Sequence, residues 1–321
     1  MRGADYVIKR TVFALMTVFV AVTLNFIIFR AAPGDATTAL RCRNCPVEFK
    51  EALRKELGLD KSRIQQYGIY LKELAQGDLG RSFASRQPVT DELATPIKNT
   101  IPMVLLGEVI AVFLGILTGV VAAWRRGTLL DSGSLSLSLV FYSLPTQWLG
   151  LMLVILFAGT LPISGIGDPF IAFTDPSWWE TLKDRLTHMI LPSTTLGIVL
   201  YGSYALIVRS AMLETLGEDY ILTARAKGLR NWTIVWRHAF RNALLPVTTL
   251  MAISLGYVVA GAILVEAVFS YPGIGLETYD AVFAKDYPIV QGAFLVLTLS
   301  VVLANYVADL LYFKLDPRIT T

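Results

Sequence analysis

Apolar stretches long enough to cross a membrane recur six times along the chain. Each is free or nearly free of charged side chains. They lie at residues 11–29, 99–124, 132–160, 189–208, 243–269 and 289–312. About 20 apolar residues in a helix cross roughly 30 Å of hydrocarbon, so the pattern predicts six transmembrane helices. A Leu144-Pro145 pair predicts a break near the middle of the third.

The composition supports the same fold class. The 321 residues are 54% hydrophobic and 17% charged, against about 25% charged in soluble proteins. This excludes a soluble globular protein, a disordered chain and a disulfide-stapled mini-protein. The first apolar block has 19 residues, more than the about 7–15 of a secretory signal core, so we expect a retained helix. The predicted fold class is an all-α polytopic membrane protein.

Lys and Arg are unevenly divided between the loops. With the N-terminus inside, the inner segments hold 13 basic residues and the short outer loops hold 3. Basic residues collect on the cytoplasmic side, so both termini are predicted to be cytoplasmic. The chain then divides into a first helix at 1–30, a long extracytoplasmic segment at 31–98 with turns such as 77–80, a core at 99–313 and a tail at 314–321.

The most basic inner segment lies between the fourth and fifth helices. Asp219 is expected to cap a short helix that Gly228 ends. A second helix is expected at residues 233–242, ending before Leu245-Pro246. The pattern alone leaves two interpretations open, a basic helix lying on anionic lipid headgroups and an elbow that docks on another protein.

Motifs in this segment and beyond it resemble one family. They are Asp219-Tyr220, residues 223–229 (TARAKGL), residues 237–243 (RHAFRNA) and Leu245-Pro246, with further likeness at residues 30–35, 57–60, 66–67, 77–82, 265–275 and 316–318. Together they resemble ABC-importer permeases, and more narrowly the first permease subunit of the oligopeptide/dipeptide/nickel branch. The general permease signature begins Glu-Ala-Ala, whereas residues 222–224 read Leu-Thr-Ala. The peptide branch shares this departure.

The resemblance implies the type I ABC importer permease fold in a bacterial cytoplasmic membrane. It implies one half of a pathway for di- or oligopeptides, with nickel, glutathione or another small solute as the alternative. The implied partners are a second homologous permease, two ATPase subunits, an extracytoplasmic substrate-binding protein and the lipid bilayer, with no nucleic acid. The chain lacks a G-x-x-x-x-G-K-[ST] phosphate loop. We therefore expect a non-enzymatic subunit without a cofactor, whose partners bind ATP and Mg²⁺.

The resemblance also assigns the short basic helix to coupling with the ATPase. Small Ala224 and Ala226 would permit close approach, and Arg225 and Lys227 would pair with acidic groove residues. The expected coupling residues are Asp219, Tyr220, Thr223, Ala224, Arg225, Ala226, Lys227, Gly228 and Leu229.

Three acids fall inside the apolar blocks, where each charge costs at least about 2.5 kcal/mol at mid-depth. Glu108 either lines the translocation path, where it could meet a peptide amino terminus, or makes a buried hydrogen bond to a neighbouring helix. Glu266 either reaches water or, with Pro272 and Gly273, shapes the outer gate. Asp309 is expected to make a structural pairing.

Cysteine and histidine give little further chemistry. Cys42 and Cys45 lie in the exported segment, where a local disulfide is expected. His188 and His238 stand apart from each other and from any Cys or acid cluster, so no metal site is predicted. The sequence contains neither H-E-x-x-H nor G-x-S-x-G, motifs that would indicate a membrane-embedded enzyme. A proton-coupled carrier could use the buried acids, but six helices with an ABC-type elbow argue against it.

Overall fold

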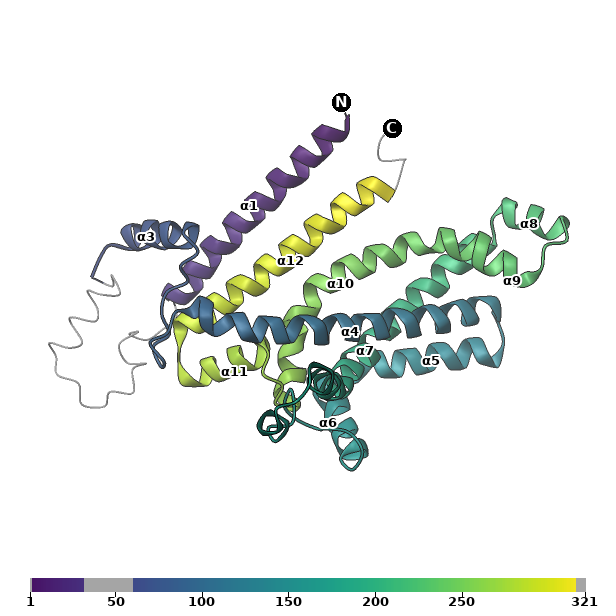
Figure 1. The fold of residues 1–321 in the computed structure, drawn as a ribbon. Helices are drawn as coiled ribbons and strands as arrows, with labels where there is room; N and C mark the ends of the chain where they lie inside the picture. Colours follow the sequence, from purple (N-terminus) through teal and green to yellow (C-terminus); the bar gives the residue numbers. More distant parts are fainter. Residues whose placement is uncertain (1, 32–59, 316–321) are drawn as a thin grey trace. The chain divides into compact units, whose positions relative to one another are not determined.

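The computed structural model describes residues 2–31 and 60–315. Its regular structure over these ranges is helical, with one isolated antiparallel bridge between Arg81 and Pro88 (Figure 1). The chain forms two compact units, Met1–Asn99 with Gly273–Thr321, and Thr100–Pro272. We call them the outer-strap unit and the elbow unit and describe each by itself.

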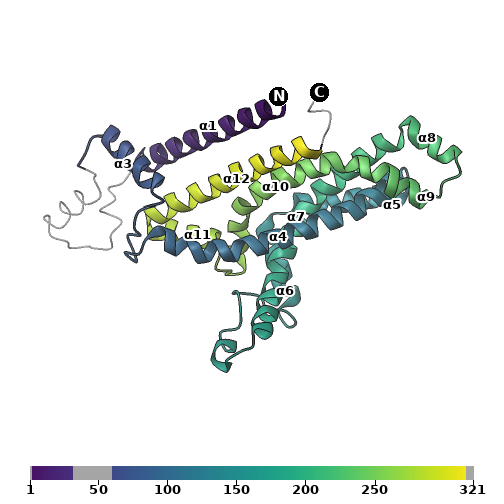
Figure 2. The same ribbon diagram turned by 45° about the horizontal axis from the view of Figure 1, so that its top comes forward.

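The outer-strap unit is built on two long helices that lie side by side (Figure 2). Its elements are α1 (Arg2–Ala31), α3 (Arg63–Ala75), the start of α4 (Val89–Trp124), α11 (Ile274–Ala284) and α12 (Tyr287–Leu315). Polar side chains join α1 to α12. The Thr11 and Tyr306 hydroxyls are 2.8 Å apart, and Arg10 Nη1 lies 3.0 Å from Asp309 Oδ2. The predicted structural pairing of Asp309 is confirmed.

A polar anchor holds the loop before α4. Asp286 is buried and accepts hydrogen bonds from the Ser82 hydroxyl at 2.5 Å and from the Phe83 and Ala84 backbone N–H groups at 3.1 and 3.0 Å. The predicted turn at residues 77–80 is confirmed, because Gly77 and Gly80 have φ values of 78° and 86°. The anchor therefore ties residues 82–84 to Asp286, the residue just before α12.

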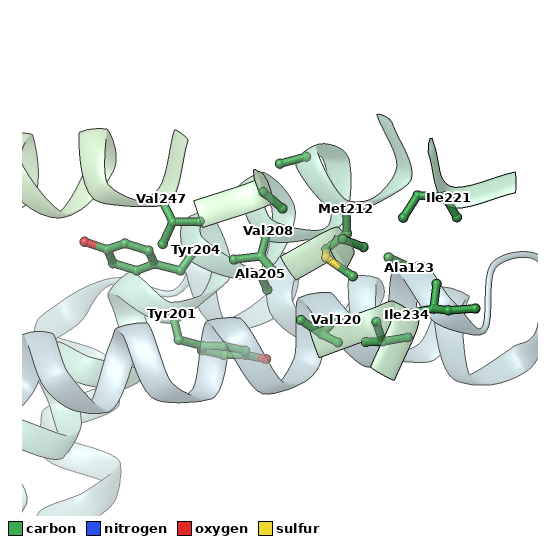
Figure 3. Packing of buried hydrophobic residues seen from close by; sticks show 14 of the residues in the cluster. Val120, Ala123, Tyr201, Tyr204, Ala205, Val208, Met212, Ile221, Ile234 and Val247 are labelled. Carbon is green, nitrogen blue, oxygen red and sulfur yellow. The ribbon is translucent and has the colours of Figure 1, made fainter. Parts of the chain in front are cut away.

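The elbow unit is centred on α7, which packs against α5, α6 and α10. Its elements are the rest of α4, α5 (Leu129–Ser143), α6 (Thr146–Phe157), η2 (Ile171–Thr174), α7 (Trp178–Leu216), α8 (Asp219–Ala226), α9 (Asn231–Thr233), the π-helical turn η3 (Ile234–Ala239) and α10 (Phe240–Val268). A buried apolar cluster takes residues from α4, α7, α8, η3 and α10 (Figure 3).

Glycines allow α4 and α7 to approach closely. A Cβ atom added to Gly115 would lie 2.3 Å from Tyr204 Cβ, and one added to Gly119 would lie 2.7 Å from Val208 Cβ. On the other side of the contact, a Cβ on Gly197 would lie 2.6 Å from Ile110 Cγ2. We call this contact the glycine seam. It has the small-residue packing typical of helices in lipid.

Among the described residues, four helices are long and apolar enough to cross a membrane, and the bent pair α5 and α6 counts as a fifth if it is one span. The break predicted at Leu144-Pro145 in the third apolar block is confirmed, and there α5 and α6 meet at 102°. Leu144 is extended, with ψ of 134°, and ends α5. Pro145 disfavours the helical conformation at the residue before it, so the helix cannot continue.

Several helices extend past their predicted ends. The blocks expected from 99 and 189 belong to α4 and α7, which begin at Val89 and Trp178. Hydropathy marks only the part of a helix that lies in lipid, while α7 starts at a capping box between Ser177 and Glu180. The end predicted before Leu245-Pro246 is also wrong, because α10 runs through Pro246.

Candidate functional site

The elbow, residues 217–239, connects α7 to α10 and contains α8 and α9. The N-cap of α8 is Glu218, which is extended with ψ of 148° and makes no side-chain capping bond. The prediction that Asp219 caps this helix is therefore wrong. Asp219 is the first helical residue, where its charge favours the positive end of the helix.

Gly228 ends the short helix as predicted. It has φ of +74°, and a Cβ atom added there would meet nothing within 4 Å. The left-handed backbone, and not crowding, requires glycine at this position. The N–H of Gly228 donates to Arg225 O at 2.9 Å, and that of Leu229 donates to Ala224 O at 3.3 Å, so the last turn keeps its carbonyls paired.

The elbow has a buried face and an exposed face. Ile221 and Ala224 are buried, and Ile221 lies near Met212 and Ile234 in the apolar cluster (Figure 3). Ala224 therefore does not lie on the outer surface, and the close-approach role expected of it is wrong. The exposed face consists of Asp219, Tyr220, Leu222, Thr223, Arg225, Ala226, Lys227, Gly228 and Leu229.

Aromatic side chains brace the base of the elbow. Tyr220 OH accepts a hydrogen bond from Asn242 Nδ2 at 2.7 Å, which joins α8 to α10. Trp236 lies 5.4 Å from the Trp232 ring centroid and 5.1 Å from that of Phe240. Trp236 also falls in the π-helical turn, a form common at functional sites. The elbow is thus a braced unit continuous with both long helices.

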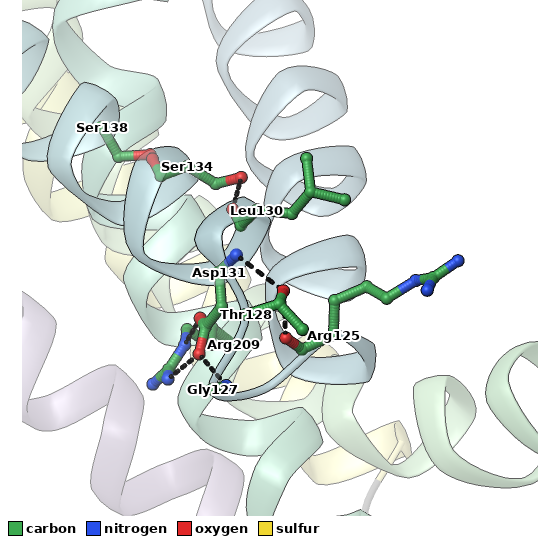
Figure 4. A network of polar contacts seen from close by, with 8 residues as sticks. All are labelled: Arg125, Gly127, Thr128, Leu130, Asp131, Ser134, Ser138 and Arg209. Atoms are coloured by element: carbon green, nitrogen blue, oxygen red, sulfur yellow. Dashed lines mark hydrogen bonds and ion pairs between the residues drawn. The ribbon is translucent and has the colours of Figure 1, made fainter.

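An ion pair that sequence reasoning missed lies close to the elbow. The Arg209 guanidinium on α7 donates two hydrogen bonds, of 2.7 and 2.9 Å, to the Asp131 carboxylate on α5 (Figure 4). The Gly127 N–H donates to the same carboxylate at 2.9 Å. Bidentate pairs of this kind fix orientation as well as distance. No local pattern marks this pair, because Asp131 and Arg209 are 78 positions apart in the sequence.

Glu108 lies at a junction of three helices. Its Oε1 accepts hydrogen bonds from the Tyr204 hydroxyl of α7 and the Ser254 hydroxyl of α10, and these two hydroxyls are 2.6 Å apart. Glu108 is 3% exposed. Of its two interpretations, the buried hydrogen bond to neighbouring helices is confirmed.

Glu266 is fully buried, so the interpretation that it reaches water is wrong. The Thr100 hydroxyl donates to its Oε1 at 2.5 Å. Nearby, burial and the Glu266 charge raise the pKa of Tyr271 to about 12, against the opposing effect of Arg185. Pro272 is exposed and Gly273 is buried at the N-cap of α11. These contacts form a packed end to α10 and do not test the predicted gate.

The remaining candidates add no metal chemistry. Cys42 and Cys45 lie outside the described residues, as do most of motif 30–35 and all of motif 316–318, so the disulfide stays a prediction. His188 Nδ1 lies 3.2 Å from Asp184 Oδ1, which is a single carboxylate and not an acid cluster. In the described ranges, no three His, Cys, Asp or Glu side chains gather as they would around a metal ion.

Comparisons with known proteins cover nearly the whole chain. Residues 111–321 match the model of the binding-protein-dependent transport system inner membrane component family, and residues 4–104 match that of its N-terminal region. The chain is 40% identical to the di/tripeptide transport system permease protein DppB of Pseudomonas aeruginosa (strain UCBPP-PA14), over 98% of both chains. It is 37% identical to the dipeptide transport system permease protein DppB of Escherichia coli (strain K12), again over 98% of both.

Proposed function

Because the chain belongs to the binding-protein-dependent transport system inner membrane component family, we propose that it carries di- or oligopeptides across the cytoplasmic membrane. It is the permease subunit of an ATP-driven importer and not an enzyme. The peptide cargo rests on relatives of nearly equal length whose names specify dipeptides or tripeptides. Nickel, glutathione or another small solute is the alternative cargo.

The proposed topology has six transmembrane helices with both termini in the cytoplasm. Four helices and the bent pair account for five spans. We assign the sixth to α10, whose 29 residues reach about 43 Å. The excess of Lys and Arg in the inner segments supports this orientation. It places the elbow inside, and it places α3 and α11 outside.

The proposed complex contains this chain, a second homologous permease, two ATPase subunits and a substrate-binding protein. The family description itself implies the binding protein and the ATPase. The exposed face of the elbow, with Arg225 and Lys227 beside Leu222, offers the ATPase a surface that is both basic and apolar. Closure of the ATPase pair would move this face and tilt α7 and α10, exchanging inward-facing and outward-facing states.

Gly228 gives the sharpest test of docking. Valine at φ of +74° is strained by about 1–2 kcal/mol, whereas asparagine tolerates this region. In the reconstituted complex, we expect Gly228→Val to lower peptide uptake and peptide-stimulated ATP hydrolysis together, by about tenfold. Gly228→Asn should keep most of both. Unchanged uptake and hydrolysis in the valine variant, with the ATPase still bound, would refute docking through the elbow.

The cargo is tested on the partner binding protein. Mass spectrometry of ligands retained by the purified binding protein should find peptides of a few residues. Recovery of a metal chelate or of glutathione would show that the cargo is not a peptide. Uptake in vesicles that have a proton gradient but no ATP would instead indicate a secondary carrier.

A further inference from the structure

The junction at Glu108 joins the two helices that carry the elbow. Tyr204 lies on α7, thirteen residues before the elbow begins at Gly217, and Ser254 lies on α10, fourteen residues after Phe240. At 1.5 Å per residue, each is about 20 Å from the elbow. A displacement of the elbow is therefore transmitted over nearly equal lengths of two helices to one carboxyl group on α4.

The two sides of the junction are held differently. The glycine seam holds α4 to α7 on both sides of Glu108, since added Cβ atoms would lie 2.9 Å from Leu196 Cβ at Gly107 and 2.3 Å from Tyr204 Cβ at Gly115. At the junction, α10 is joined to this pair through the Ser254 hydroxyl, which contacts both Glu108 and Tyr204. Besides its apolar packing on α7, α10 therefore has at this level a directional set of hydrogen bonds to both α4 and α7.

Stability does not account for an acid at this position. Glu108 Oε2 is buried and has no hydrogen-bond partner within the described part of the chain. A half-satisfied buried carboxyl group is a poorer stabiliser than apolar packing. Its presence at the meeting point of the elbow helices favours a role in transport.

We propose that Glu108 is a positioning residue that makes α7 and α10 move together beyond the junction, so that movement of the elbow opens the outer half of the pathway. This inference rests on the proposed function of the elbow. It assigns Glu108 to force transmission and not to contact with the cargo.

The test measures ATP hydrolysed per peptide transported, in the complete complex reconstituted in liposomes. Ser254→Ala removes the α10 bonds with little change of volume, and Glu108→Leu removes the acceptor. We expect both to raise the ratio about fivefold or more while ATP hydrolysis persists. Glu108→Gln keeps a carbonyl oxygen that accepts both bonds, so its ratio should stay near that of the unmodified protein.

Ser203→Ala is the matched control. Its hydroxyl bonds Leu200 O within α7, beside Tyr204 but away from the junction, so the ratio should not change. If Glu108→Leu does not assemble, Ser254→Ala alone decides the outcome. An unchanged ratio in Ser254→Ala refutes the proposal, and so does a weaker uptake affinity for peptide at an unchanged ratio, which would assign Glu108 to the cargo.

A distance measurement separates this inference from elbow docking. The spin labels would be placed in a Cys42→Ser, Cys45→Ser background, all at exposed sites. A pair at Glu214 and Arg241 would report the distance between the inner ends of α7 and α10. A pair at Lys183 and Leu264 would report the distance between their outer ends. In Ser254→Ala, ATP should still shift the inner distance but no longer the outer one. A persisting outer shift refutes transmission through the junction. Loss of the inner shift in Gly228→Val, with Ser254→Ala retaining it, supports both proposals.

Discussion

Two pairs of long helices in this protein are joined by different means. In the outer-strap unit, α1 meets α12 through polar side chains: Thr11 with Tyr306, Arg10 with Asp309, and Asn25 Nδ2 with Gln291 O at 3.2 Å. In the elbow unit, α4 meets α7 mainly through the glycine seam, where a Cβ atom added to Gly115 or Gly119 would lie within 3 Å of an atom of α7.

The difference bears on how each pair responds to force. Side-chain hydrogen bonds between helices in lipid are worth about 0.6 kcal/mol each, and long side chains can follow a small shift. A close backbone contact fixes the distance between helix axes, because any shift loses packing over the whole length. We therefore expect α4 and α7 to move as one body, while α1 and α12 can adjust against each other.

The largest expected effect comes from breaking the glycine seam. Gly115→Val places a branched side chain where Tyr204 Cβ already stands, and overpacking of this kind costs about 1–3 kcal/mol or more. We expect loss of folded permease, measured as the heat-resistant monodisperse fraction in detergent. Gly133→Val on α5, where nothing lies within 4 Å, is the control and should be tolerated. Equal stability of the two variants would contradict the rigid seam.

The second test asks what a polar joint contributes inside the elbow unit. The Asp131 carboxylate is 6% exposed and paired with Arg209, so Asp131→Asn leaves a partly buried guanidinium without its counter-charge. Because Arg209 is 23% exposed, we expect a loss of about 1–3 kcal/mol, below that for a fully buried pair. The midpoint of thermal unfolding measures it.

Arg125→Gln is the control for that experiment, because Arg125 is an exposed charge in the turn between α4 and α5. It should leave the midpoint unchanged. A larger loss from Asp131→Asn than from Gly115→Val would reverse the order of the two kinds of joint.

The sequence predicted the parts of this comparison that are local. The apolar blocks locate the long helices, and Gly228 ends α8 because only its own backbone conformation is at issue. The spacing of Gly107, Ala111, Gly115 and Gly119, one small residue every four, was also readable as a close-packing face. The helix against which this face of α4 packs could not be predicted, because that depends on which helices the fold brings together.

Partners far apart in sequence were the part that could not be predicted. Asp131 and Arg209 are 78 positions apart, and Glu108 is 96 and 146 positions from Tyr204 and Ser254. Nothing local marks such pairs. The 102° bend between α5 and α6 was predicted only as a break, because a proline ends a helix without setting the direction of the next one.

A smaller effect is expected where α1 meets α12. Tyr306→Phe removes the hydroxyl bonded to Thr11 and should cost about 0.6 kcal/mol. Tyr142→Phe on α5, an exposed tyrosine, is the control. The double variant Thr11→Val, Tyr306→Phe should cost no more than the two single changes together, which a double-mutant cycle of unfolding free energies measures. A loss as large as that of Gly115→Val would show that this pair is also rigid.

The smallest effect is a pH dependence confined to the outer-strap unit. Burial, and then the charges of Glu92, Asp280 and Asp286, raise the pKa of Glu277 on α11 above its ordinary value of 4.5. The folded state then holds this proton more tightly than the unfolded chain does. The resulting stability is complete below pH 4.5 and is lost as pH rises through the folded pKa.

Glu277→Gln stays neutral, so we expect a higher unfolding midpoint at pH 7.5 than in the unmodified protein and a flatter profile from pH 5 upward. Glu214→Gln, an exposed change on α7, should alter neither. If Glu277→Gln lowers the midpoint at pH 7.5, the Glu277 carboxylate stabilises the fold, and the acidic neighbours do not set its titration.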